Sequence, residues 1–222
     1  HDIVIIGYDD DQQLVHVVDN DRTDVQLVPY DALAKARSST SFPEPTRHTI
    51  YDIRWPDTLP DLRTAAADAF ARSATTMTTP GRSAIAGPDA DHTATGLTAV
   101  GGFVDDLQAW PDVFDERTLA IALAALPAFI EKAGTGGGLF RRLLSRGCEE
   151  LAGHLRHPSL DTLTDAAQRV ASAWTSVAAT AASSDTDNVN QRARHTARTA
   201  QPLVELEQHL CRQLRDCGAQ LR

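Results

Sequence analysis

The sequence has few cysteines, one methionine, no long apolar run and no excess of positive charge. Three cysteines in 222 residues cannot close a paired disulfide framework, which predicts a reducing compartment, the cytoplasm. The longest apolar stretch, residues 119–130, has 12 residues and contains Pro127, so it is too short to span a membrane. A net charge of −9 argues against nucleic-acid binding, which needs a basic surface.

The remaining composition, 42% hydrophobic and 23% charged, is that of a globular protein. Its charge is uneven, because residues 1–115 carry a net charge of −11 and residues 116–222 a net charge of +2. No signal segment opens the chain. His1 begins an apolar run typical of a strand, and Met77 is the only methionine, so we expect the sequence to be a fragment, a cropped chain or a processed product.

The first quarter of the sequence has the pattern of short strands joined by turns. We expect four strands and one short helix (30–37), the strands being residues 1–7, 14–18, 25–28 and 48–55. Asp9, Asp10 and Asp11 lack the glycine and the distal glutamate of a calcium loop, and they predict a hairpin turn instead. Because the first apolar run does not alternate with polar residues, it predicts a strand that is covered on both faces.

From residue 57 onward the apolar period becomes helical. We expect helices over residues 59–76, 96–110, 116–132, 140–154, 159–182 and 189–220, the last bent at Pro202. The sequence therefore predicts an α+β chain in which a short antiparallel β segment, residues 1–56, precedes an all-α domain, residues 57–222.

His1 and Asp19 are the first candidates for chemistry. They stand at the same end of the predicted hairpin, on strands whose antiparallel pairing can bring their side chains together. A histidine that acts as a base needs such a carboxylate to fix its tautomer and stabilise the imidazolium. A surface histidine beside a turn aspartate is the alternative. The pair predicts a direct or single-water hydrogen bond.

A glycine-rich segment, Ala133-Gly134-Thr135-Gly136-Gly137-Gly138-Leu139-Phe140-Arg141-Arg142, is the second candidate. Backbone N–H groups of Gly136, Gly137 and Gly138 could bind an anion at the start of a helix, assisted by Arg141. The alternative is a flexible linker between two helices. No Lys-Ser/Thr follows the glycines, so the segment is not a Walker P-loop.

Both candidates resemble parts of one family. His1-Asp2-Ile3-Val4-Ile5-Ile6-Gly7-Tyr8-Asp9, followed by Leu14-Val15-His16-Val17-Val18-Asp19, resembles the His…Asp segment of papain-like cysteine enzymes. The glycine-rich segment, taken with Trp110-Pro111 and Trp174, resembles the C-terminal helical domain of the butirosin biosynthesis protein H family. The resemblance spans roughly residues 1–215, with residues 1–56 as the remnant of a papain-like catalytic domain.

The resemblance implies an acyltransferase of natural-product (antibiotic) biosynthesis. A cysteine would take an aminoacyl group from a carrier-protein thioester and pass it to a small-molecule amine, with His1 as base and Asp19 as its orienter. The implied partners are an acyl carrier protein and the amine acceptor. The chain needs no cofactor of its own, since phosphopantetheine belongs to the carrier. By analogy with an anion site, Gly136, Gly137, Gly138, Arg141 and Arg142 would receive the carrier or its arm, on the side of the molecule that His1 faces.

The cysteines depart from the family's order, in which the nucleophile precedes the histidine. Cys148, Cys211 and Cys217 lie in predicted helices after His1, and we expect them to be buried, without a disulfide. This chain alone is then inactive by that mechanism. Two alternatives remain: a papain-like cysteine peptidase or amide hydrolase, and a catalytically inactive helical scaffold that binds a partner. His154 and His157 could ligate a metal, but their place at a helix end favours pairing with the helix dipole, and we expect no metal site.

Overall fold

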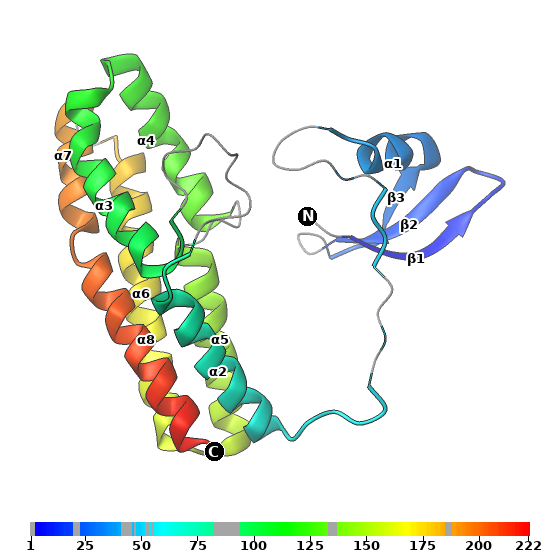
Figure 1. Ribbon diagram of the computed structural model, residues 1–222. Helices are drawn as coiled ribbons and strands as arrows, with labels where there is room; N and C mark the ends of the chain where they lie inside the picture. The colour runs from blue at the N-terminus through cyan, green and yellow to red at the C-terminus, as the bar shows by residue number, and fades with distance from the viewer. Residues whose placement is uncertain are drawn as a thin grey trace. The chain divides into compact units, whose positions relative to one another are not determined.

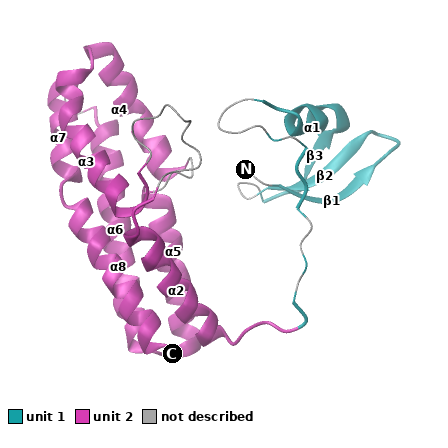
Figure 2. Cartoon of the chain, in the orientation of Figure 1, with its two compact units in different colours: residues 1–57 teal, residues 58–222 magenta. Residues whose placement is uncertain are grey.

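A computed structural model describes residues 3–19, 23–40, 46, 48–51, 54, 56–81, 94–132, 137–184 and 188–222. The chain forms two compact units, residues 1–57 and residues 58–222, which Figure 2 shows in different colours. The division lies one residue beyond the boundary expected from the change in apolar period. Together the units make an α+β protein, as the sequence predicts.

The described residues of the first unit form an antiparallel sheet of order β1-β2-β3 and one helix. Their bounds are β1 Val4–Asp9, β2 Leu14–Val18, β3 Gln26–Pro29 and α1 Tyr30–Arg37. In the β1–β2 ladder, Val4 lies opposite Val18 and Asp9 opposite Leu14, with a bulge between Ile5 and Gly7. The register therefore brings the two residues that flank the ladder, Ile3 and Asp19, to the same end of the hairpin.

The turn between β1 and β2 is closed by its own side chains. The Asp9 carboxylate accepts a hydrogen bond from the Gln12 backbone N–H at 2.9 Å, which lowers the pKa of Asp9. The Tyr30 hydroxyl donates to the Asp10 carboxylate at 2.8 Å, and this bond raises the pKa of Tyr30 to about 12. Asp9 to Asp11 thus form the predicted hairpin turn, which also anchors the first residue of α1.

Two expectations for this unit are wrong. The apolar side chains of β1 are exposed on both faces of the sheet, with Val4 at 61% and Ile6 at 55%. In the first unit's described residues, only Val15 and Val17 of β2 are buried apolar side chains, because β1 is an edge strand in a sheet of three. The expected strand over residues 48–55 is also absent from the described part of that segment, residues 48–51 and 54.

The second unit is a bundle of helices α2 to α8. Their bounds are α2 Leu62–Thr78, α3 Gly96–Val113, α4 Glu116–Glu131, α5 Gly137–Leu155, α6 Pro158–Ala182, α7 Val189–Ala200 and α8 Leu203–Gln220. Figure 1 shows them as four columns, α2 with α3, α4 with α5, α6 alone, and α7 with α8. With 25 residues, α6 is the longest of the described helices and forms its column without interruption, and it packs against α4, α5, α7 and α8.

Local sequence explains where several helices begin. Asp61, Asp115 and Asn188 are N-caps whose side chains accept hydrogen bonds from backbone N–H groups three residues later. Apolar side chains spaced by three or four residues then form the buried stripe of a helix, as with Leu119, Leu123 and Leu126 in α4. Burial of these stripes between columns makes the core of the bundle.

Several helix boundaries differ from the prediction, and two of the differences affect how the bundle is built. α5 begins at Gly137 rather than at residue 140, so two glycines assigned to a loop are helical. The last predicted helix is divided into α7 and α8 at Gln201 and Pro202, because proline has no N–H to continue the α-helical ladder. Across the described residues, no helix has the length and apolarity that crossing a bilayer requires.

One pair of substitutions tests the asymmetry of the small sheet. Val17→Thr places a hydroxyl in the interior of the first unit, and we expect a loss of about 1–3 kcal/mol in the free energy of unfolding. Val4→Thr, the same change on the exposed edge strand, should leave that free energy nearly unchanged and reduce binding of a hydrophobic dye. Hydrogen exchange of the β2 amides measures the first effect, and equal protection in the two variants would contradict the assignment of β1 as exposed.

Candidate functional site

The predicted site residues are divided between the two units. His1 and Gly136 lie outside the described residues. Asp19 directly follows β2 in the first unit and is half-buried. Gly137, Gly138, Arg141 and Arg142 all lie in the first two turns of α5, in the helical unit. The hydrogen bond expected between His1 and Asp19 therefore stays a prediction, whereas the surroundings of the α5 residues can be described atom by atom.

Arg141 is held by a carboxylate in the interior of the bundle. Its Nη2 lies 2.9 Å from each oxygen of Glu207, a residue of α8 whose side chain has no exposed surface. The Trp174 indole N–H of α6 donates to the same carboxylate at 2.8 Å. A buried charge is stable only when it is paired and hydrogen-bonded, and Glu207 has both partners. These three residues, which we name the buried triad, join α5, α6 and α8.

Arg142, the next residue of α5, is likewise held by a carboxylate from another helix. Its Nη1 pairs with the Glu131 carboxylate of α4 at 2.5 Å and also donates to the Thr175 hydroxyl of α6 at 3.1 Å. Thr175 in turn donates to Glu131 at 2.7 Å. Glu131 and Arg142 are partly exposed, so this second network contributes less than a desolvated pair would. It joins α4, α5 and α6.

The two glycines at the start of α5 make room for these networks. A Cβ on Gly137 would lie 2.5 Å from ring atoms of Trp174, and a Cβ on Gly138 would lie 2.6 Å from a carboxylate oxygen of Glu131. Each glycine precedes its arginine by four residues, so Gly137 and Arg141 share one face of α5, and Gly138 and Arg142 share the adjacent one. The glycines let the partners of the two arginines approach the helix backbone.

These contacts give the helical part of the glycine-rich segment a packing role. Gly137 and Gly138 are buried in the bundle rather than part of a flexible linker. The charges of Arg141 and Arg142 are balanced by Glu207 and Glu131. That the segment receives a carrier protein remains an untested prediction.

Sequence reasoning missed Glu207 and Glu131. Glu207 was detectable in part, because it occupies a buried position of the apolar stripe of α8, four residues after Leu203 and three before Leu210. A lone glutamate in such a stripe indicates a buried ion pair. Glu131 offers no comparable signal, since an acidic residue near a helix end is ordinarily solvated.

The three cysteines are free and buried, as expected. Burial, with a smaller contribution from nearby Cys217, raises the pKa of Cys148 to about 12. Burial also raises the pKa of Cys211 and of Cys217, although a hydrogen bond from Ser159 opposes the shift at Cys217. A thiol reacts as its thiolate, so none of these side chains has the properties of a catalytic nucleophile.

His157 has a structural role at the start of α6. It is the N-cap residue, and its Nδ1 lies 2.7 Å from the Ser159 hydroxyl, which in turn contacts the Cys217 sulfur at 3.2 Å. In the part of the chain that the structure describes, no group of three or more His, Cys, Asp or Glu side chains could hold a metal ion.

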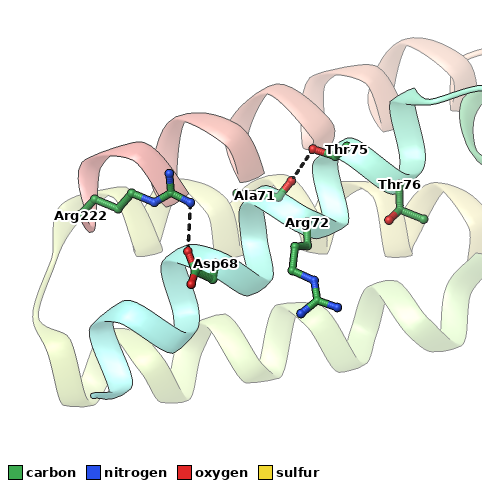
Figure 3. Close-up of a pocket in the computed structure, with 6 residues that line it drawn as sticks. All are labelled: Asp68, Ala71, Arg72, Thr75, Thr76 and Arg222. Atoms are coloured by element: carbon green, nitrogen blue, oxygen red, sulfur yellow. Dashed lines mark hydrogen bonds and ion pairs between the residues drawn. The ribbon is translucent and has the colours of Figure 1, made fainter. Parts of the chain in front are cut away.

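Cavities in the helical unit include two that are lined by described residues. The smaller, about 380 Å³, lies along α2 beside the C-terminal Arg222, whose guanidinium bonds Asp68 at 3.0 Å (Figure 3). Both partners are largely exposed and Arg72 extends away from them, so the pair stabilises the chain by about 0–1 kcal/mol and forms no enclosed site. The larger, about 580 Å³, is bounded by α3 and α4 and has Arg141 and Trp174 of the buried triad in its wall.

The family model described as Domain of unknown function (DUF4872) matches residues 31–214. The match starts in α1 of the first unit, includes all of α2 to α7 and ends within α8. No curated protein and no solved structure matches the chain.

Two glycines of α5 provide a matched test of the packing described above. Gly137→Ala forces the Trp174 ring to move, and we expect a loss of about 1–3 kcal/mol in the free energy of unfolding. Gly147→Ala, in the same helix with open space around it, should instead stabilise the bundle by about 0.5–1 kcal/mol, because alanine has the higher helix propensity. Chemical denaturation followed by tryptophan fluorescence measures both, and two shifts of the same sign would contradict this packing.

Thiol reactivity tests the state of the cysteines. Because burial raises all three pKa values, native protein at pH 8 should react with a disulfide reagent at least 100-fold more slowly than a free thiol. After denaturation three equivalents should react at once. Rapid labelling of one thiol in the native protein would show that a reactive cysteine had been overlooked.

Proposed function

We propose that this chain, which belongs to the DUF4872 family, takes part in acyl transfer from a carrier-protein thioester to the amine of a small molecule. In this proposal His1 is the general base and Asp19 orients it. The carrier protein brings the phosphopantetheine arm, so the chain itself needs no cofactor. The proposal starts from the resemblance of residues 1–19 to the His…Asp hairpin of papain-like enzymes.

The observation that supports it best is the register of the β1–β2 hairpin. Val4 pairs with Val18, so Asp19 continues β2 beside the end of β1 that is nearest to His1. The Asp19 side chain is also half-buried, which strengthens its electrostatic interaction with a neighbouring cation. An orienting carboxylate needs both properties, because it must hold one tautomer of the histidine and stabilise the imidazolium.

The chemistry has two steps. In the first step the histidine takes the proton of a cysteine thiol, and the resulting thiolate attacks the carrier thioester. The bond between the acyl carbon and the pantetheine sulfur breaks, and the pantetheine thiol leaves with a proton from the imidazolium. The amine then attacks the new thioester, the histidine accepts its proton, and the amide is released as the first thiol is restored. Because Cys148, Cys211 and Cys217 are all buried, the proposal requires a cysteine thiol that is supplied from outside these 222 residues.

A helical module that binds a partner is the second candidate. The burial of all three thiols favours it, because it leaves the 222 residues without an exposed cysteine. The two candidates differ in what they predict for Asp19, which matters for catalysis and has no role in a helical module.

The experiment compares Asp19→Asn with Asp24→Asn in the full-length protein, given an aminoacyl carrier protein and an amine acceptor. Asp24 is an exposed acid of the same unit and serves as the control. If Asp19 orients the base, Asp19→Asn should lower amide formation about 10²–10⁴-fold, whereas Asp24→Asn should retain it. Mass spectrometry of the carrier measures the loss of acyl group. Equal activity in both variants, or no transfer by either variant or the parent, would favour the helical module.

A further inference from the structure

The larger cavity of the helical unit has the dimensions of a small-molecule site. It measures about 580 Å³, within the range of roughly 300–1,000 Å³ typical of ligand pockets. Its walls come mainly from α3 and α4, while Met77 of α2, Gly137 and Arg141 of α5, and Trp174 of α6 complete them. We propose that this cavity binds a small organic molecule in which an apolar ring or short chain carries an uncharged carbonyl group, as in an acyl amide or ester.

The apolar part of the ligand is inferred from the walls. Four aromatic side chains line the cavity, and they are Phe103, Trp110, Phe129 and Trp174. The Phe103 and Trp174 rings already lie 5.3 Å apart in a tilted arrangement, which leaves faces and edges on which a third ring can pack. Aliphatic and alanine side chains form most of the rest of the wall. Burial of the apolar part of a ligand against them removes apolar surface from water and therefore favours binding.

The carbonyl is inferred from Arg141, which is the charged residue in the cavity wall. Among the described residues its guanidinium is bonded through Nη2 alone, to Glu207, although a guanidinium has five N–H donors. The side chain retains 18% exposure and lines the cavity, and we infer that some of these donors face it. An acceptor oxygen on the ligand can therefore hydrogen-bond to Arg141 without breaking the buried triad.

The absence of charge on the ligand follows from Glu207. Its carboxylate already balances the charge of Arg141 at 2.9 Å, so a ligand carboxylate would bring a second anion close to a fully buried one. Like charges in a region of low dielectric repel strongly, whereas a neutral carbonyl accepts the same hydrogen bond without that repulsion. The cavity should thus prefer an amide to the matching carboxylate.

The position of the cavity explains why the bundle leaves it open. Met77 at the end of α2, Gly96 at the start of α3, and Ile130 near the end of α4 all line it, so it lies where two columns are interrupted. Gly96 has a φ of +62°, and a Cβ there would overlap the carbonyl of Met77. The alanines at 99, 122 and 125 leave space that larger side chains would fill.

This inference goes beyond acyl transfer and does not depend on His1 or Asp19. The test uses the 222-residue chain with Trp55→Phe, so that tryptophan emission comes from Trp110 and Trp174, both in the cavity wall. Three matched probes are titrated: 3-phenylpropanamide, 3-phenylpropanoate and propylbenzene. The amide should change the emission at the lowest concentration, with a Kd at least tenfold below those of the carboxylate and the hydrocarbon.

Cavity-filling variants locate the binding. Ala125→Phe fills the cavity from α4 and should weaken amide binding at least tenfold, whereas Ala124→Phe, on the exposed side of the same helix, should not alter it. If Ala125→Phe fails to fold by circular dichroism, Ala122→Leu replaces it. Equal titrations in the filled and control variants, or no response to any probe at millimolar concentration, would overturn the site.

A double variant tests the role of Arg141. Arg141→Met with Glu207→Gln removes both charges together and keeps an acceptor for the Trp174 N–H, so no unpaired charge is left in the bundle. The variant should bind the amide and propylbenzene with similar affinity. Tighter binding of the carboxylate than of the amide by the parent chain, or an unchanged preference for the amide in the double variant, would overturn the ligand class.

Discussion

The Glu207 carboxylate has no contact with water, and both of its oxygens are occupied by the Arg141 guanidinium, with the Trp174 indole as a further donor to one of them. Moving such a charge out of water costs several kcal/mol, and this cost is offset only if all three side chains meet in good geometry. That condition holds for one relative placement of α5, α6 and α8. The buried triad therefore fixes the register of three helices whose apolar stripes would tolerate others.

Trp174 connects this constraint to the rest of the bundle. Its ring lies against Gly137 of α5 and Phe103 of α3, and its N–H reaches α8. It also stands on α6, the uninterrupted column. Trp174 thus fills part of the space between the helix ends of the interrupted columns, and the cavity whose wall it shares occupies another part.

The sequence predicted the helices whose formation depends mainly on the spacing of their own apolar residues. The helical period of the apolar residues predicted α4, α6 and the paired α7–α8 segment, and α4 begins at residue 116 as expected. The start of α5 could not be predicted, because glycines favour a loop until their partners are known, and Trp174 lies 37 residues beyond Gly137. The same limit applies to β1, whose apolar run predicts burial while its neighbours in the sheet decide exposure.

The candidate site shows a similar division. The sequence drew attention to Gly137, Gly138, Arg141 and Arg142, but it could not assign their contacts, because the partners come from three other helices. The cavity could not be predicted from the sequence for a further reason. It exists because side chains on α3 and α4 are small, and an alanine-rich helix has the same sequence pattern whether or not it faces a cavity.

Because the other columns are interrupted, the helical unit has two layers along its length, and α6 belongs to both. The lower layer contains α2, α5 and α8, and the upper layer contains α3, α4 and α7 (Figure 1). The buried triad lies on α5, α6 and α8, whereas the alanines of the cavity lie on α3 and α4. Changes of side-chain volume at residues 99, 122 or 125 thus alter the shape of the cavity without replacing a residue of the triad. A helical unit of this kind can bind different small molecules after substitutions at a few positions of α3 and α4.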